Sequence, residues 1–201
     1  MSRLFALLCG LVCLTAHASD LMKEVRGRLA DAPLLRGTFE QQKAVAGFKK
    51  PLVSRGDFLV VRGQGVLWNT RSPFASSLTV TRRSLTAEQE GAAAYHLESS
   101  REPALAAVNE LLLALVSGDL SVLATRFRFE GELVAGGGWR LTLTPTESGV
   151  SRLFQRVRLE GDRFVRRVEL AEVQGDSTRI VFDTLSQTPP PSPEEAERLG
   201  K

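Results

Sequence analysis

The residue types that usually carry out catalysis are sparse in this chain. Its two histidines are His17 and His96, and its two cysteines are Cys9 and Cys13. A Ser-His-Asp arrangement would have to use His96, which lies at the edge of a predicted strand. An imidazole in such a place is more often solvated or packed than catalytic. An exported hydrolase that uses Ser, Asp and His96 is therefore the weakest of the alternatives.

Carboxylate pairs and a glycine run are the other candidates for chemistry. The pair Glu194/Glu195 falls in a polar stretch, where both side chains are expected to be solvated rather than to act as acid and base. The run 136–138 consists of three glycines, but a strand beginning at Trp139 follows it instead of a helix with Lys-Ser/Thr. A phosphate-binding loop needs that helix, so the glycines predict a hairpin turn. We therefore expect no enzymatic activity.

The composition is that of a soluble globular protein. Of 201 residues, 43% are hydrophobic and 24% are charged, which excludes a disordered, collagenous or disulfide-stapled chain. The length suits one domain with a sizeable core. Lys and Arg total 26 against 23 Asp and Glu, and the basic residues are scattered. This small, dispersed surplus predicts that nucleic acid is not the partner.

The first eighteen residues have the pattern of a secretory signal peptide. Arg3 precedes an apolar run over residues 4–15, and Ala16-His17-Ala18 ends it with small residues at the cleavage positions. We expect cleavage after Ala18 and a periplasmic product. Both cysteines would be removed, leaving no thiol for a disulfide or a nucleophile. A zinc site with one histidine and no thiol would be unusual, so we expect no metal and no cofactor.

Hydrophobic periodicity predicts two helices and many strands in the remaining chain. Apolar residues recur at helical spacing over residues 20–30 and 102–117. Strand-like runs cover residues 34–45, 51–62, 66–70 and 78–81. The stretch 86–94 suits either a helix or a hairpin. From residue 127 to 182, period-2 alternation with glycine turns predicts an antiparallel meander, in which Leu153, Val157 and Leu159 share a face. Residues 194–199 could add a short helical turn.

The strand at 56–61 indicates how the sheet is covered. It is apolar on both faces, with Phe58 and Val60 on one and Leu59 and Val61 on the other. Such a strand suits a curved sheet that is covered on one side and lined with apolar side chains on the other. A strongly curved sheet with a small lid can leave a cavity.

Three motifs carry a resemblance to a known family. Thr38–Lys43 contains a Phe-x-Gln motif, Leu52–Arg62 is a Gly-x-Phe strand that ends in arginine, and Gly65–Trp68 is a strand with a tryptophan, followed by Ser72-Pro73-Phe74. In this order and spacing they resemble the periplasmic lipoprotein carrier family, LolA. Together with the signal peptide and the order of helices and strands, the resemblance covers most of the mature chain.

The resemblance implies a mainly β fold with some α: an incomplete antiparallel β-barrel, or curved sheet, with a helical lid that encloses an apolar cavity for acyl chains. It implies a carrier domain at 19–188 between the signal peptide (1–18) and a Pro-rich tail (189–201). The implied partners are a lipoprotein or lipid cargo, an inner-membrane transporter as donor and an outer-membrane acceptor. The carrier itself is expected to be a monomer.

The resemblance also suggests a set of ligand-binding residues. Arg62 matches the family arginine that hydrogen-bonds lid carbonyls and holds the empty cavity shut, a role that suits the five donors of a guanidinium. The expected lining is Phe58, Val60, Val66, Trp68, Leu78 and Val80 from the sheet and Leu105, Leu112 and Leu115 from the lid. For each lining residue, plain core packing is the alternative.

Two further functions stay open. Divergent members of the family accompany the export of other lipids, such as aryl polyenes, together with membrane exporters. An apolar groove of this kind could also hold a peptide helix, which would make the chain a periplasmic protein-binding module.

Overall fold

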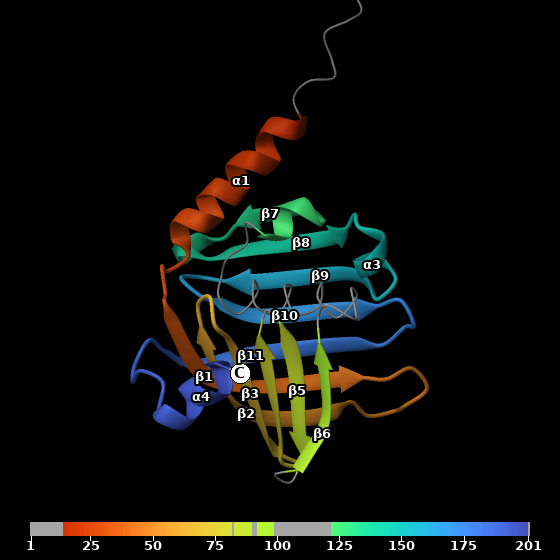
Figure 1. The fold of residues 1–201 in the computed structure, drawn as a ribbon. Helices are drawn as coiled ribbons and strands as arrows, with labels where there is room; N and C mark the ends of the chain where they lie inside the picture. Colours follow the sequence, from red (N-terminus) through yellow and green to blue (C-terminus); the bar gives the residue numbers. More distant parts are fainter. Residues whose placement is uncertain (1–13, 82, 90–91, 99–121, 201) are drawn as a thin grey trace, which may run out of the picture.

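The computed structural model describes residues 14–81, 83–89, 92–98 and 122–200, and its main feature is one large sheet (Figure 1). The first strands are β1 (Leu34–Ala44), β2 (Leu52–Val61), β3 (Gly65–Ser72), β4 (Ser76–Thr81), β5 (Ser84–Gln89) and β6 (Ala92–Glu98). The later strands are β7 (Phe127–Leu133), β8 (Trp139–Pro145), β9 (Phe154–Gly161), β10 (Val165–Glu172) and β11 (Ser177–Ser186). The helical elements are α1 (Leu14–Arg28), α3 (Ser148–Ser151), α4 (Pro193–Gly200) and the 3₁₀ turns η1 (Val122–Thr125) and η2 (Ala135–Gly137).

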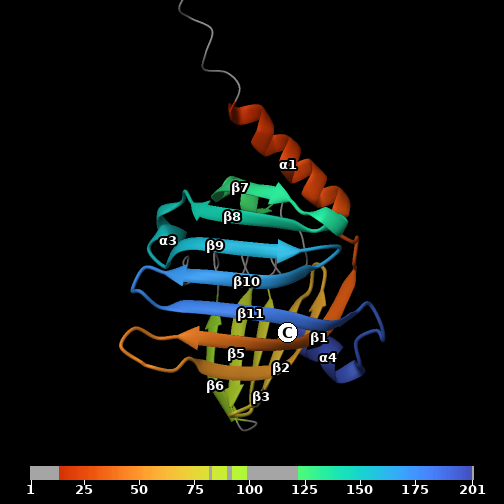
Figure 2. The same ribbon diagram turned by 180° about the vertical axis from the view of Figure 1, so that it is seen from behind.

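The sheet consists of two antiparallel meanders joined by their first and last strands. The 11 strands formed by the described residues follow the order β6-β5-β4-β3-β2-β1-β11-β10-β9-β8-β7. At the β1/β11 pair Phe39 lies opposite Phe182, so residues far apart in sequence become neighbours. Figures 1 and 2 show that β3 to β6 run steeply across the direction of β8 to β10. The sheet is therefore strongly curved, with an inner, concave face and an outer, convex face.

The main hydrophobic core lies on this inner, concave face. Alternate residues of both meanders point into it, and Val25 of α1 and Leu123 of η1 are fully buried among them. In β8 the side chains of Trp139, Leu141 and Leu143 are buried, as the period-2 pattern predicts. One apolar cluster therefore unites the two halves of the sheet.

The outer, convex face is covered in part by α4. Leu199 of α4 packs against Leu34, Leu59 and Leu67, whose side chains point away from the main core. Arg36 holds the same segment: it donates hydrogen bonds to the carbonyl of Pro189, 3.0 Å away, and to both carboxylate oxygens of Glu195, at 3.0 and 3.2 Å. The expectation that Glu195 is simply solvated is therefore wrong, because this carboxylate joins α4 to the sheet.

Most of the predicted elements are confirmed, and the curved antiparallel sheet is the fold expected. The ambiguous stretch 86–94 belongs to the β5–β6 hairpin, and 194–199 lies within α4. The placement of Leu153 on the face of Val157 and Leu159 is wrong: Leu153 is 39% exposed and precedes β9. The reason is that 148–151 form the helical turn α3, which fills the core position with Val150 instead. The predicted helix 102–117 lies outside the described residues.

Candidate functional site

The predicted lining residues from the sheet come together on the concave face. Phe58, Val60, Val66 and Val80 are buried in the main core, and Trp68 and Leu78 pack against it while remaining partly exposed. Their strands, β2 to β4, are consecutive in the sheet, and each residue alternates with one that points outward. The structure thus gathers all six on one apolar surface. Leu105, Leu112 and Leu115 lie outside the described residues.

Four aromatic rings form the centre of this surface. Trp68 stacks on Phe39, with ring centroids 3.8 Å apart, and meets Phe182 edge to face at 6.1 Å. Phe58 meets Phe182 edge to face at 5.2 Å. Offset and edge-to-face pairs are each worth about 0.5–1.5 kcal/mol beyond burial. Because the rings come from β1, β2, β3 and β11, the cluster lies across the junction of the two meanders.

Gly56 makes room for this cluster. It lies opposite Phe39 in the β1/β2 ladder. A Cβ atom at this position would lie 1.9 Å from the backbone oxygen of Asn69 and 2.8 Å from a ring carbon of Phe39. Only glycine allows the strand and the ring to approach so closely. Sequence reasoning used Gly56 as part of a motif, and the structure supplies the physical reason for it.

Arg62 lies at the end of β2, beside the end of α1. Its backbone N–H donates to the carbonyl of Pro33, 2.9 Å away, and its guanidinium forms an ion pair with the carboxylate of Asp31. Both side chains are exposed, and an exposed ion pair contributes about 0–1 kcal/mol. A contact of this strength holds a side chain in place but is easily broken. The predicted role of Arg62 as a latch stays a prediction.

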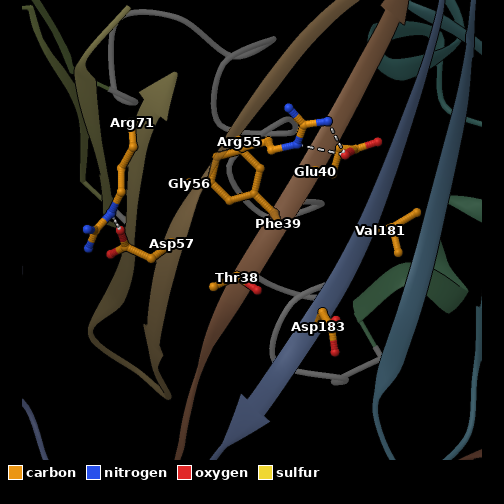
Figure 3. A pocket seen from close by; sticks show the side chains of 9 residues that line it. All are labelled: Thr38, Phe39, Glu40, Arg55, Gly56, Asp57, Arg71, Val181 and Asp183. Atoms are coloured by element: carbon orange, nitrogen blue, oxygen red, sulfur yellow. Dashed lines mark hydrogen bonds and ion pairs between the residues drawn. The ribbon is translucent and has the colours of Figure 1, made fainter. Parts of the chain in front are cut away.

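A pocket of about 730 Å³ lies over β3, β2, β1 and β11 (Figure 3). The residues that line it are Thr38, Phe39, Glu40, Arg55, Gly56, Asp57, Arg71, Val181 and Asp183. All of these except Phe39 and Gly56 alternate with the concave-face side chains, so the pocket belongs to the convex face. The sequence did not predict this pocket, although Arg55 and Asp57 of β2 alternate with Gly56 and Phe58 in the way expected of an outward-facing polar row.

Four of the five charged residues that line this pocket form ion pairs. Arg55 forms an ion pair with Glu40 at 2.7 Å, and Arg71 pairs with Asp57. The pKa of Glu40 is lowered, first by a hydrogen bond from Gln42 and then by Arg55. At neutral pH this carboxyl group therefore has no proton to give as a general acid. The geometry favours a structural polar surface over a catalytic site.

The other predicted candidates for chemistry are also accounted for. His96 is exposed on β6, and its Nδ1 lies 2.8 Å from the hydroxyl of Thr86. The glycine run 136–138 forms the turn between β7 and β8, as expected. In the part of the chain that the structure describes, His, Cys, Asp and Glu form no cluster that could hold a metal ion. None of the described helices is long and apolar enough to cross a membrane.

Comparison with known proteins supports the fold and a family. Residues 15–189 match the family described as outer membrane lipoprotein carrier protein LolA-like. Among proteins of curated function, none is similar enough in sequence to be recognised as a relative.

Solved structures with a similar fold share little sequence with this chain. A DUF1329 family protein from Desulfovibrio piger aligns with a TM-score of 0.50 and 11% identity, over 87% of this chain and 95% of that one. A putative outer membrane lipoprotein-sorting protein domain from Vibrio parahaemolyticus gives 0.49 and 12%, over 92% and 99%. A LolA superfamily protein from Nitrosomonas europaea gives 0.45 and 10%, over 87% and 94%.

Proposed function

The chain belongs to the LolA-like family of outer membrane lipoprotein carrier proteins, and we propose that it is a periplasmic carrier that shields the acyl chains of a lipoprotein or lipid. The observation that carries this proposal is the apolar concave face with its four-ring aromatic cluster. Trp68 and Leu78 remain partly exposed there and offer contact to a ligand. The donor in this proposal is an inner-membrane transporter, and the acceptor lies at the outer membrane.

The physical need for such a carrier comes from the cost of exposing acyl chains to water. Each methylene exposed to water costs roughly 0.8 kcal/mol. A carrier only has to cover the chains and then release them to a partner that binds them more tightly. Flat aromatic rings and branched side chains suit this task because they offer contact area without demanding hydrogen bonds. Binding of this kind needs no cofactor.

Arg62 fits this proposal as a weak latch. Its partner, Asp31, follows α1, so the ion pair joins the end of that helix to the end of β2. Because both side chains are exposed, the pair can open at little cost when cargo enters. The further contact of Arg62 with lid carbonyls remains part of the proposal.

The test compares polar substitutions on opposite faces of the same sheet. Leu78→Ser places a hydroxyl on the concave face, and Val181→Ser makes a similar change on the convex face. With a fluorescent fatty acid as the probe, we expect Leu78→Ser to weaken binding about tenfold, since one buried leucine is worth about 1.5–3 kcal/mol. Val181→Ser should bind as the wild type does.

Native mass spectrometry of protein purified from its own periplasm supplies the second measurement. Co-purified acylated species would support the carrier, and their chemical class would separate lipoprotein from another lipid such as an aryl polyene. Absence of saturable binding to the probe, together with a mass free of lipid, would refute the carrier and favour the protein-binding module.

A further inference from the structure

The hairpin between β1 and β2 presents large apolar side chains and two lysines to solvent. Phe48 is 70% exposed and Leu52 is 59% exposed, and Lys49 and Lys50 between them are exposed as well. We refer to these four residues as the hairpin tip. Exposed aromatic and aliphatic side chains beside lysines form an amphipathic surface that does not contribute to the hydrophobic core.

The hairpin is held in place by the neighbouring turn between β10 and β11. The backbone N–H of Ala46 donates to Asp176, 2.9 Å away, and Lys43 forms ion pairs with Asp176 at 3.6 Å and Glu172 at 3.3 Å. These two carboxylates are therefore engaged by Lys43. Among the described residues, no carboxylate lies within ion-pair distance of Lys49 or Lys50. The hairpin tip thus carries, on a fixed support, two lysines without an ion-pair partner in the described part of the chain.

Further apolar side chains lie at the same end of the sheet. Val173, 44% exposed, follows β10, and its backbone N–H donates to the carbonyl of Leu153, 3.1 Å away. Arg152, also exposed, precedes Leu153. Figures 1 and 2 both show the β1–β2 and β10–β11 connections and α3 projecting at one end of the sheet. Apolar and basic groups therefore lie at the same end of the sheet.

We infer that the hairpin tip docks the protein on the surface of a bilayer that contains anionic phospholipid. Phenylalanine and leucine side chains partition into the boundary between headgroups and acyl chains. Lysines beside them are attracted to lipid phosphates. Charge complementarity selects this partner, because the exposed apolar groups are bordered by unpaired cations and the nearby carboxylates are engaged by Lys43.

Co-sedimentation with vesicles tests the inference. The vesicles hold equal parts of phosphatidylglycerol and phosphatidylcholine, and pure phosphatidylcholine vesicles serve as the neutral comparison. The double variant Lys49→Gln/Lys50→Gln should lose about 30-fold in vesicle affinity, since each lysine contributes about fivefold near an anionic surface. High salt should produce the same loss in the wild type. Phe48→Ser/Leu52→Ser should bind several-fold more weakly, and both variants should fold normally because the changed side chains are exposed.

Two controls separate docking from other causes. Phe74→Ser removes an aromatic ring that is 75% exposed in the turn after β3, and it should leave vesicle binding unchanged. Leu78→Ser, on the concave face, should also bind vesicles as the wild type does, although it binds the acyl probe about tenfold more weakly. Equal losses in Phe74→Ser or Leu78→Ser would overturn the inference, as would unchanged binding in the lysine variant. If the wild-type protein does not co-sediment with anionic vesicles, the inference is wrong and a protein partner is favoured instead.

Discussion

Substitution of Leu199 by alanine should reveal how firmly the C-terminal helix holds the sheet. Leu199 is 4% exposed and fills the space between Leu34, Leu59 and Leu67. Its Cδ2 atom would also lie only 3.2 Å from a Cβ placed at Gly65, so the helix rests directly on β3. Replacement of a buried leucine by alanine typically lowers the free energy of unfolding by about 2–5 kcal/mol. Because this short helix can relax into the space that the leucine leaves, we expect a loss of about 2–3 kcal/mol. For a chain of this size the melting temperature should fall by about 5–10 °C.

The assay is thermal and urea unfolding followed by circular dichroism. The matched control is Leu52→Ala, which removes the same atoms from a leucine that is 59% exposed and should change stability by less than about 0.5 kcal/mol. If Leu199→Ala unfolds at the same urea concentration as Leu52→Ala, then α4 does not stabilise the convex face and the packing argument is wrong.

Three more changes follow from the structure. Gly56→Ala should destabilise the fold by about 2 kcal/mol or more in urea, because its methyl would overlap the backbone oxygen of Asn69. Glu195→Gln should lower stability at neutral pH. The hydrogen bond from Arg36 lowers the pKa of Glu195 from its ordinary 4.5, so the stabilising contribution of the carboxylate is present above that value and is lost as pH falls through the lowered pKa. Arg62→Leu should change the rate at which bound acyl probe is released while it alters stability by less than about 1 kcal/mol.

The first two of these changes have a natural comparison in the chain. Gly149→Ala adds a methyl where nothing lies within 4 Å, and its unfolding midpoint should stay close to that of the wild type. Glu194→Gln alters an exposed neighbour of Glu195 and should leave the pH profile of stability unchanged. A pH profile that Glu195→Gln does not flatten, or a release rate that Arg62→Leu does not alter, would contradict the role assigned to that residue.

Local pattern was enough to predict most strands and the apolar surface. The alternation in β8 works because Trp139, Leu141 and Leu143 meet the core while their neighbours meet water. The two-faced apolar pattern at 56–61 predicted a sheet covered on one side and lined with apolar side chains on the other; in the structure Phe58 enters the main core, and Leu59 packs with Leu199 of α4.

Tertiary contacts explain what the sequence pattern could not predict. Leu153 looks like part of an alternating strand, but α3 ends just before it and supplies Val150 to the core in its place. The docking of α4 rests on the buried side chain of Leu199 and on the hydrogen bonds from Arg36 to Glu195, and both are long-range contacts that no local pattern shows. The convex pocket forms across four strands, and two of them, β1 and β11, are paired only in three dimensions.

The pairing of β1 with β11 sets an order in which the protein can be assembled. Each meander consists of hairpins between sequence neighbours, which form quickly, whereas Phe39 and Phe182 can meet only after nearly the whole chain is available. Until then β1 presents an open ladder of amide and carbonyl groups, the kind of edge that promotes aggregation. A newly synthesised chain would expose this edge until its final strand arrives, and a nonsense codon before residue 177 would leave the aromatic cluster without its fourth ring.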